Sequence, residues 1–128
     1  MSSARNMNTL DNAQAVEARI RVLLDAMSIE EKVGQLNQVQ CTGPNVVEDL
    51  AAGIRSGRIG SVINVVDPNA INAMQHIAIH ESRHGIPLLI GRDVIHGFQT
   101  IAPLPLGQAA SWNPDLVRDC ARVSAQEA

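Results

Sequence analysis

Aromatic residues are scarce in this sequence of 128 residues, which has one Trp, one Phe and no Tyr. The core must therefore be aliphatic, and the chain lacks the aromatic platforms on which single-stranded nucleic acids stack their bases. Its 10 Lys and Arg residues are scattered among 13 Asp and Glu residues, for a net charge of −3. No basic stripe is available to follow a phosphate backbone. These absences argue against nucleic acid as a partner.

Long hydrophobic runs are also absent. No segment approaches the roughly 18 to 20 apolar residues that a transmembrane helix needs, and the first residues lack the apolar core of a secretory signal. The sequence as written therefore predicts a soluble, cytoplasmic chain with no membrane partner. The two cysteines, Cys41 and Cys120, form no CxxC motif, which argues against a disulfide framework and a thiolate zinc site. We expect buried free thiols.

What is present is typical of one globular domain, with 45% apolar and 18% charged residues. Residues 1–12 are polar and aperiodic, so we expect a flexible arm there and a folded domain at residues 13–128. The first predicted helix follows the arm. Its apolar face, which we expect to be buried, consists of Val16, Ile20, Leu23, Leu24 and Met27.

Capping signals mark the starts of further helices. Ser28 and Glu31 form a capping box, Asp67 precedes a proline that suits the first helical position, and Asn113 does the same before the last helix. Apolar spacing predicts another helix from Val46, with Gly57 as its left-handed stop. The helix after Asp67 is expected to end near His84–Gly85.

Predicted strands alternate with these helices. They lie at residues 33–39, 59–66, 86–90 and 106–111. The second is apolar at nearly every position after Ser61, which is typical of a parallel strand covered on both faces. The alternation favours an α/β fold with a parallel sheet. A complete doubly wound domain would fit in this length, whereas a (β/α)8 barrel needs about 250 residues, so a barrel would be partial, with about three to four βα units.

Asp93 follows the predicted strand 86–90, at the carboxyl end where parallel α/β folds place ligand-binding groups. Gly91 before it would let backbone or substrate approach closely. A lone carboxylate there can accept two charge-assisted hydrogen bonds from vicinal sugar hydroxyls. From the residues alone, a ligand contact and a loop cap are equally good interpretations.

Four ordered blocks make the sequence recognisable. They are SIEEKVGQL at 28–36, ESRHGIPLL at 81–89, GRDVIHG at 91–97 and PLGQAASWNP at 105–114. Together they resemble the amino-terminal part of glycoside hydrolase family 3, near the bacterial periplasmic-type β-glucosidases. The resemblance covers roughly residues 16–128.

The resemblance implies a (β/α)8 barrel that hydrolyses β-linked glucosides with retention, using an aspartate nucleophile and a glutamate general acid, with no cofactor or metal. Asp93 matches the aspartate with which this family holds sugar hydroxyls in subsite −1. Arg92 and His96 are further candidates for substrate binding, although loop ordering suits them better. Gln99 and Ala102 replace a basic residue and a phenylalanine that relatives usually carry, which predicts a weaker or reshaped sugar pocket.

The family's Lys-His pair, its nucleophile segment and its acid-bearing second domain all lie beyond the matched portion. Retaining hydrolysis needs two carboxyl groups about 5 to 5.5 Å apart, and Asp93 alone cannot serve as both. Several other acids fall on predicted helices, such as Glu30, Glu31, Glu48, Asp49 and Glu81. We therefore expect no catalytic residue and no turnover in the isolated chain. Relatives often carry an export signal, so a periplasmic location stays open.

A second interpretation is a catalytically inactive module that binds sugar weakly or pairs with another chain. A partial barrel exposes a sheet edge and apolar surface, so self-association is expected unless something covers them.

The segment from His80 to His84 fits the zinc-protease pattern H-E-x-x-H, and His76 adds a third imidazole one turn earlier. However, Gly85 and Pro87 are expected to end the helix at the second histidine, and Pro87 breaks the longer metzincin pattern. The sequence therefore predicts no zinc catalysis. The favoured interpretation is an exposed helix that happens to carry three histidines, and adventitious metal binding by His76, His80 and His84 is the lesser alternative.

Overall fold

The computed structural model describes the backbone of residues 3–128 and the side chains of residues 12–128. The chain forms two compact units, Met1–Ile90 and Gly91–Ala128. In the first unit the elements are α1 (Ser3–Ala26), α2 (Ile29–Gln35), β1 (Gln38–Gln40), α3 (Val46–Arg55), β2 (Ser61–Ile63) and α4 (Pro68–His80). Strand β3 (Leu89–Gly91) leads into the second unit, which contains α5 (Pro105–Ala109) and α6 (Pro114–Glu127).

Helix α1 begins at Ser3 and so covers most of the stretch expected to be an arm; the first two residues lie outside the described part. The expected burial of its apolar face is wrong, because Val16 is 52% exposed, and Ile20 and Leu24 are each 44% exposed. Only Met27, just beyond the helix, is buried. Periodicity identifies the apolar face of a helix, but it does not establish that a partner covers that face.

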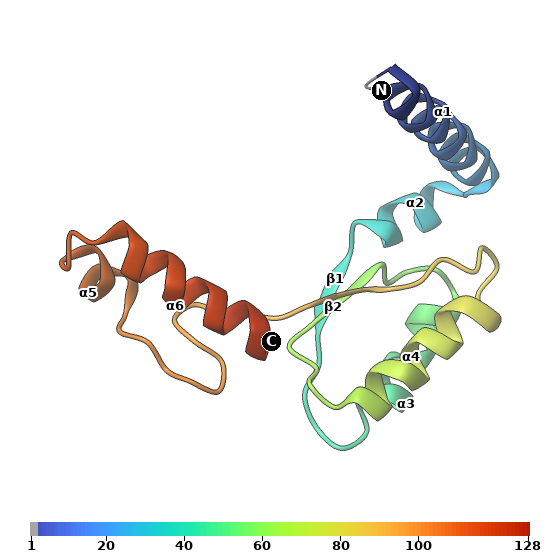
Figure 1. The fold of residues 1–128 in the computed structure, drawn as a ribbon. Helices are drawn as coiled ribbons and strands as arrows, with labels where there is room; N and C mark the ends of the chain where they lie inside the picture. Colours follow the sequence, from blue (N-terminus) through green and yellow to red (C-terminus); the bar gives the residue numbers. More distant parts are fainter. Residues whose placement is uncertain (1–2) are drawn as a thin grey trace. The chain divides into compact units, whose positions relative to one another are not determined.

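The sheet has three strands in the order β1-β2-β3. Strands β1 and β2 pair in parallel, with Val39 opposite Val62, and the backbone N–H of Leu89 donates to the carbonyl oxygen of Gly60 at 3.1 Å. Each strand is shorter than predicted, and β1 starts later because Val33 belongs to α2. Helices α3 and α4 pack against each other next to the sheet (Figure 1). This alternation confirms the α/β prediction.

The core lies between the sheet and these two helices. Val62 of β2, Ile54 of α3 and Met74 of α4 are its largest fully buried side chains. The other buried members of the cluster are all aliphatic and are Ala51, Ile59, Ile77, Ala78 and Leu88. The core of the described residues is therefore aliphatic, as the composition predicts.

Local signals set the helix boundaries. Both hydrogen bonds of the Ser28–Glu31 capping box are formed, and the Asp67 carboxylate accepts the backbone N–H of Asn69 at 3.0 Å. Gly57 ends α3 with a φ of 68°, a conformation that glycine adopts without steric cost. Helix α4 ends at His80 rather than near His84. These contacts hold α2, α3 and α4 at fixed lengths around the short strands.

In the second unit, the predicted strand at 106–111 is wrong. Pro105 opens the short helix α5 there, because the fixed φ of proline suits a first helical turn. Asn113 caps α6 as predicted, since its side-chain oxygen accepts the backbone N–H groups of Asp115 and Leu116.

Neither cysteine forms a disulfide bond in the structure. Cys41 and Cys120 are free thiols, as expected, but both are half-buried rather than buried. Among the described residues, no helix combines the length and apolar character that crossing a membrane requires.

Candidate functional site

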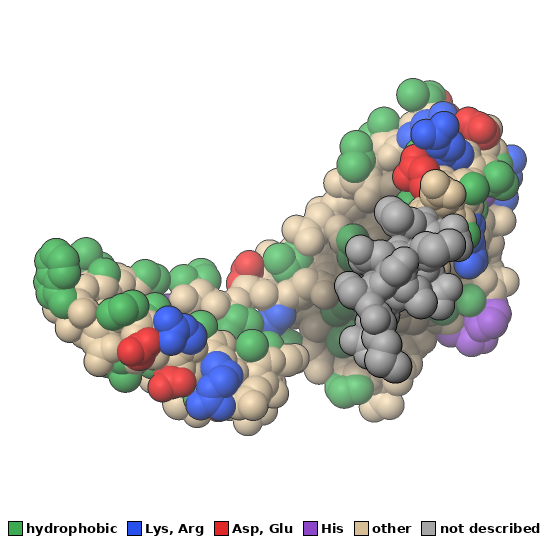
Figure 2. All heavy atoms as spheres, turned by 45° about the horizontal axis from the view of Figure 1, so that its top comes forward, with side chains coloured by type: hydrophobic (Ala, Val, Ile, Leu, Met, Phe, Trp, Pro, Cys, Tyr) green, Lys and Arg blue, Asp and Glu red, His purple; other side chains and the backbone are tan. Residues whose placement is uncertain are grey.

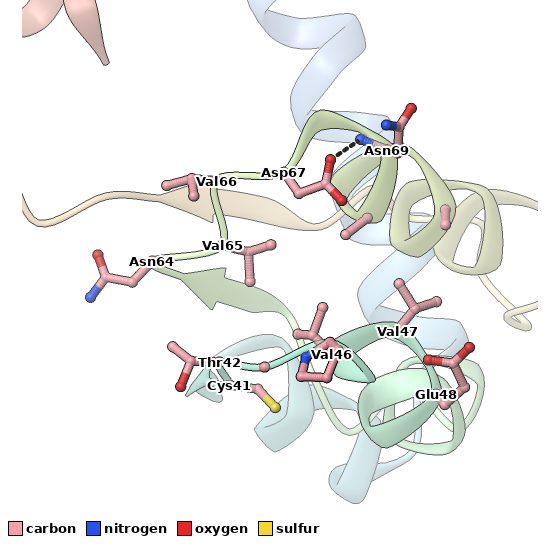
Figure 3. Close-up of a pocket in the computed structure, with 14 residues that line it drawn as sticks. Cys41, Thr42, Val46, Val47, Glu48, Asn64, Val65, Val66, Asp67 and Asn69 are labelled. Carbon is pink, nitrogen blue, oxygen red and sulfur yellow. Dashed lines mark hydrogen bonds between the residues drawn. The ribbon is translucent and has the colours of Figure 1, made fainter. Parts of the chain in front are cut away.

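A cleft of about 500 Å³ lies at the carboxyl ends of β1 and β2. The loops that follow these strands, residues 41–44 and 64–67, form its walls together with the first turns of α3 and α4 (Figure 3). Parallel α/β folds place ligand sites at this end of the sheet. The cleft is therefore a candidate ligand site of the first unit.

The cleft is lined by apolar side chains and by a few polar groups. Val46 and Val65 contribute hydrocarbon surface, while Cys41, Asn64 and Asp67 add polar atoms (Figure 3). Asp67 is held in place because its carboxylate caps α4. Asn64 adopts a φ of 68°, in the left-handed region. None of these residues was predicted as a site residue, although their position directly after two strands was a usable signal.

Asp93 comes two residues after the end of β3, in the second unit, and its side chain is exposed. The structure therefore keeps Asp93 at the carboxyl end of a sheet strand, as the sequence predicts. Its role as a sugar contact stays a prediction.

Arg92 and His96 both contact their own loop. The Arg92 guanidinium lies 4.9 Å from the ring centroid of Phe98, a cation–π distance. The Nδ1 atom of His96 lies 3.1 Å from the carbonyl oxygen of Ala102, and the Ala102 backbone N–H donates to the His96 carbonyl at 2.7 Å. This geometry fits the loop-ordering role better than a direct sugar contact, which remains a prediction for both residues.

Two features fix the next turn of this loop. Gly97 has a φ of 118°, and a Cβ atom there would lie 2.0 Å from the Thr100 carbonyl oxygen. The Glu127 carboxylate accepts the backbone N–H groups of Gln99 and Thr100 at 2.9 and 2.8 Å. Hydrogen bonding from Thr100 lowers the pKa of Glu127. The backbone N–H of Gln99 therefore contacts Glu127 of α6, and the sequence did not predict this contact.

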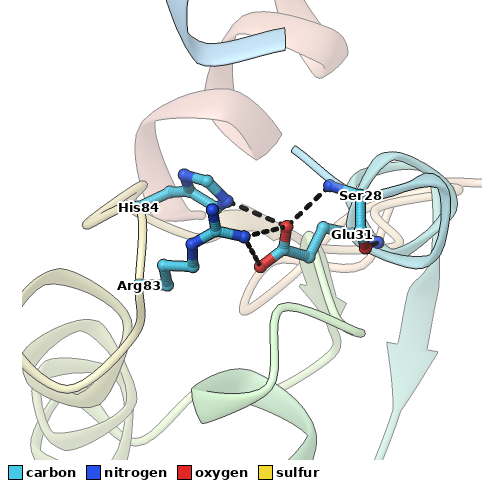
Figure 4. Close-up of polar contacts among 4 residues, drawn as sticks. All are labelled: Ser28, Glu31, Arg83 and His84. Carbon is cyan, nitrogen blue, oxygen red and sulfur yellow. Dashed lines mark hydrogen bonds and ion pairs between the residues drawn. The ribbon is translucent and has the colours of Figure 1, made fainter. Parts of the chain in front are cut away.

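The structure does not bring His76, His80 and His84 together at one point. His76 and His80 lie on α4 with ring centroids 4.7 Å apart. His84 lies beyond the helix, and its Nε2 atom is 3.0 Å from Oε2 of Glu31 on α2 (Figure 4). No group of three His, Cys, Asp or Glu side chains in the described part of the chain is arranged to hold a metal ion.

Glu31 connects two distant segments through a partly enclosed ionic cluster. Its carboxylate accepts the Ser28 backbone N–H at 2.8 Å and pairs with Arg83, which is 52 residues away, at 3.1 Å (Figure 4). The side chains of Glu31 and His84 are only 14% and 12% exposed. The hydrogen bond from His84, followed by that from Ser28, lowers the pKa of Glu31 to about 2. The sequence predicts the capping box, but it does not predict the contacts of Glu31 with Arg83 and His84.

Comparison with known proteins defines the class. The family model described as the glycosyl hydrolase family 3 N terminal domain matches residues 28–128. The chain belongs to glycosyl hydrolase family 3. The family resemblance inferred from the sequence motifs is thereby confirmed.

Individual relatives are similar to the chain over most of its length. It is 39% identical to the periplasmic beta-glucosidase of Salmonella typhimurium over 90% of its own length and 15% of that protein, and 32% identical to beta-glucosidase C of Emericella nidulans over 88% and 22%. The crystal structure of a beta-glucosidase from Listeria innocua in complex with isofagomine matches with a TM-score of 0.69 and 31% identity, over 84% of this chain and 16% of that one. The chain thus spans about 15% to 22% of these relatives, consistent with a partial barrel.

Proposed function

We propose that the protein carrying this chain is a β-glucosidase-type glycoside hydrolase that releases terminal β-D-glucose with retention of configuration. The observation that carries this proposal is the family match over residues 28–128. It is supported by a curated relative and a solved structure, both named as beta-glucosidases, at 39% and 31% identity. The substrates are β-glucosides or short oligosaccharides.

Within that activity, Asp93 holds hydroxyl groups of the terminal glucose. Its position after β3 supports this role because ligand-binding side chains of parallel α/β folds occur at the carboxyl ends of strands. A carboxylate at such a position accepts short, directional hydrogen bonds from two neighbouring hydroxyls. Arg92 and His96 order the loop that presents it, through their contacts with Phe98 and Ala102.

The isolated 128-residue chain lacks both the nucleophile and the general acid. A general acid needs a carboxyl group whose pKa is raised toward the working pH. Hydrogen bonds from His84, Arg55 and Thr100 lower the pKa values of Glu31, Glu81 and Glu127 respectively, which supports this part of the proposal. These carboxyl groups stay ionised at neutral pH and serve as acceptors.

A second candidate function, a module that pairs with another chain or binds sugar weakly, is favoured by exposed apolar side chains. Ile29 and Val33 on α2 and Leu36 just after it are 69%, 61% and 87% exposed. Figure 2 shows hydrophobic side chains spread over the face that it draws. Such surfaces promote association in water. Sedimentation of the isolated chain at several concentrations tests this candidate, and a monomer at all of them contradicts it.

Two measurements test the proposed enzyme. The intact mass of the protein in its native source, captured with an antibody to this chain, should be several times the 13.7 kDa of the chain. That protein should release p-nitrophenol from p-nitrophenyl β-D-glucoside faster than from the matching β-D-xyloside, a control prompted by similarity to a putative beta-xylosidase. The isolated chain should release none. A native mass near 13.7 kDa, or a full-length protein inactive on both substrates, contradicts the proposal.

A further inference from the structure

His76 and His80 form a pair on the exposed side of α4. They are four residues apart, which places two helical side chains on one face, and their ring centroids are 4.7 Å apart with the ring planes tilted by 48°. The His76 side chain is 66% exposed, and His80 is also exposed. Histidine side chains are visible at the molecular surface in Figure 2. Solvent ions can therefore reach both rings.

The spacing of the two rings suits a shared metal ion. Zinc binds imidazole nitrogen at about 2.0 to 2.1 Å in tetrahedral sites, so two imidazoles on one ion have ring centroids about 5 Å apart. The observed 4.7 Å is close to this separation.

Neighbouring charges orient His76. A carboxylate oxygen of Glu81 lies 3.6 Å from its Nδ1 atom, while the other Glu81 oxygen accepts a hydrogen bond from Arg55 at 2.6 Å. A carboxylate beside Nδ1 favours a proton on that nitrogen and leaves Nε2 to bind a ligand, as in carboxylate–histidine–metal arrangements. The Arg55 contact holds the Glu81 carboxylate beside His76.

We propose that His76 and His80 bind one divalent transition-metal ion of the imidazole-preferring class, such as Ni²⁺, Cu²⁺ or Zn²⁺. The site has two protein nitrogens, and water fills the remaining coordination positions. It excludes His84, whose Nε2 atom pairs with Glu31. The pair lies toward the carboxyl end of α4, whereas ligands of α/β sheets bind at the carboxyl ends of the strands.

The test uses NiCl₂ and the full 128-residue chain at neutral pH. Paramagnetic Ni²⁺ should broaden the ring resonances of His76 and His80 before those of the other two histidines, His84 and His96. In calorimetric titrations, His76→Ala and His80→Ala should each weaken Ni²⁺ binding at least tenfold. Circular dichroism should show unchanged folding, since both side chains are exposed.

Matched controls come from the chain itself. His96→Ala and Cys41→Ser remove other possible metal ligands and should leave the affinity unchanged. Equal affinity of the wild type and His80→Ala would overturn the proposal. So would a loss of binding in Cys41→Ser or His96→Ala that matches the loss in His76→Ala.

Discussion

Replacement of Gly34 by alanine tests how α2 docks on the first unit. Gly34 is buried, and a Cβ atom there would lie 1.9 Å from the Gly57 carbonyl oxygen and 2.7 Å from Cα of Arg58. Both neighbours are backbone atoms, so no side-chain rotation relieves the clash and α2 must move. That movement strains the hydrogen bonds from Asn37 Nδ2 to the Arg58 carbonyl and from the Gly60 N–H to the Asn37 carbonyl.

The expected cost is about 2 kcal/mol of unfolding free energy. Overpacking costs about 1 to 3 kcal/mol, and a clash with backbone atoms lies at the upper end of this range. Alanine in place of glycine within a helix returns about 0.5 to 1 kcal/mol, which leaves a net cost of about 2 kcal/mol. Gly107→Ala in α5 is the control, because a Cβ atom there meets only the Pro103 side chain at 3.4 Å. The same substitution should stabilise α5 by up to about 1 kcal/mol.

Amide hydrogen exchange reports the stability of each unit separately, and urea titration followed by circular dichroism gives the global value. With an unfolding slope of about 2 kcal/mol/M, Gly34→Ala should lower the urea midpoint by about 1 M. If Gly34→Ala leaves the exchange of α2 and β1 amides unchanged, or gains stability as Gly107→Ala does, the reasoning about this contact is refuted.

Three further outcomes are expected. Met74→Ala should cost about 2 to 5 kcal/mol in urea titration because its side chain is fully buried; a cost under 1 kcal/mol contradicts the core assignment. Asn113→Ala should lower the stability of α6 by about 1 kcal/mol, measured by amide exchange, since it removes a cap that accepts two N–H groups, whereas Asn72→Ala on the exposed side of α4 serves as the control. Glu31 has a folded pKa of about 2, below its usual 4.5, so its stabilising effect is present above about pH 4.5 and is lost as the pH falls toward 2. The stability difference between wild type and Glu31→Gln should therefore shrink as the pH falls from about 4.5 toward 2, and a difference that grows over this range would contradict the ion cluster.

Signals that act over a few residues were predictable from the sequence. The capping residues Ser28, Asp67 and Asn113 correctly placed the starts of three helices because a cap and its N–H partners are neighbours in the chain. The apolar strand after Ser61 correctly indicated a buried parallel strand. Asp93 was selected by the same reasoning, since its position after a strand depends only on local sequence.

Features that depend on contacts between distant residues were not predictable. The apolar stripe of α1 was expected to be buried, yet Val16 is exposed, because a periodic pattern does not reveal its partner. Residues 106–111 suit a strand by their apolar content, but Pro105 fixes a helical first turn. The pairing of Glu31 with His84 joins segments that the chain brings together only on folding.

The most direct test of the proposed glycosidase is the effect of Asp93→Ala on kcat/KM for an aryl β-D-glucoside, measured on the protein in its native length. Loss of two charge-assisted hydrogen bonds, each about 1.5 to 3 kcal/mol, predicts a decrease of at least about 100-fold. Asp115→Ala is the matched control, because that carboxylate is 77% exposed and pairs with Arg118 on α6; its kcat/KM should equal that of the wild type. The account is contradicted if Asp93→Ala retains wild-type kcat/KM while the unmodified protein hydrolyses the glucoside.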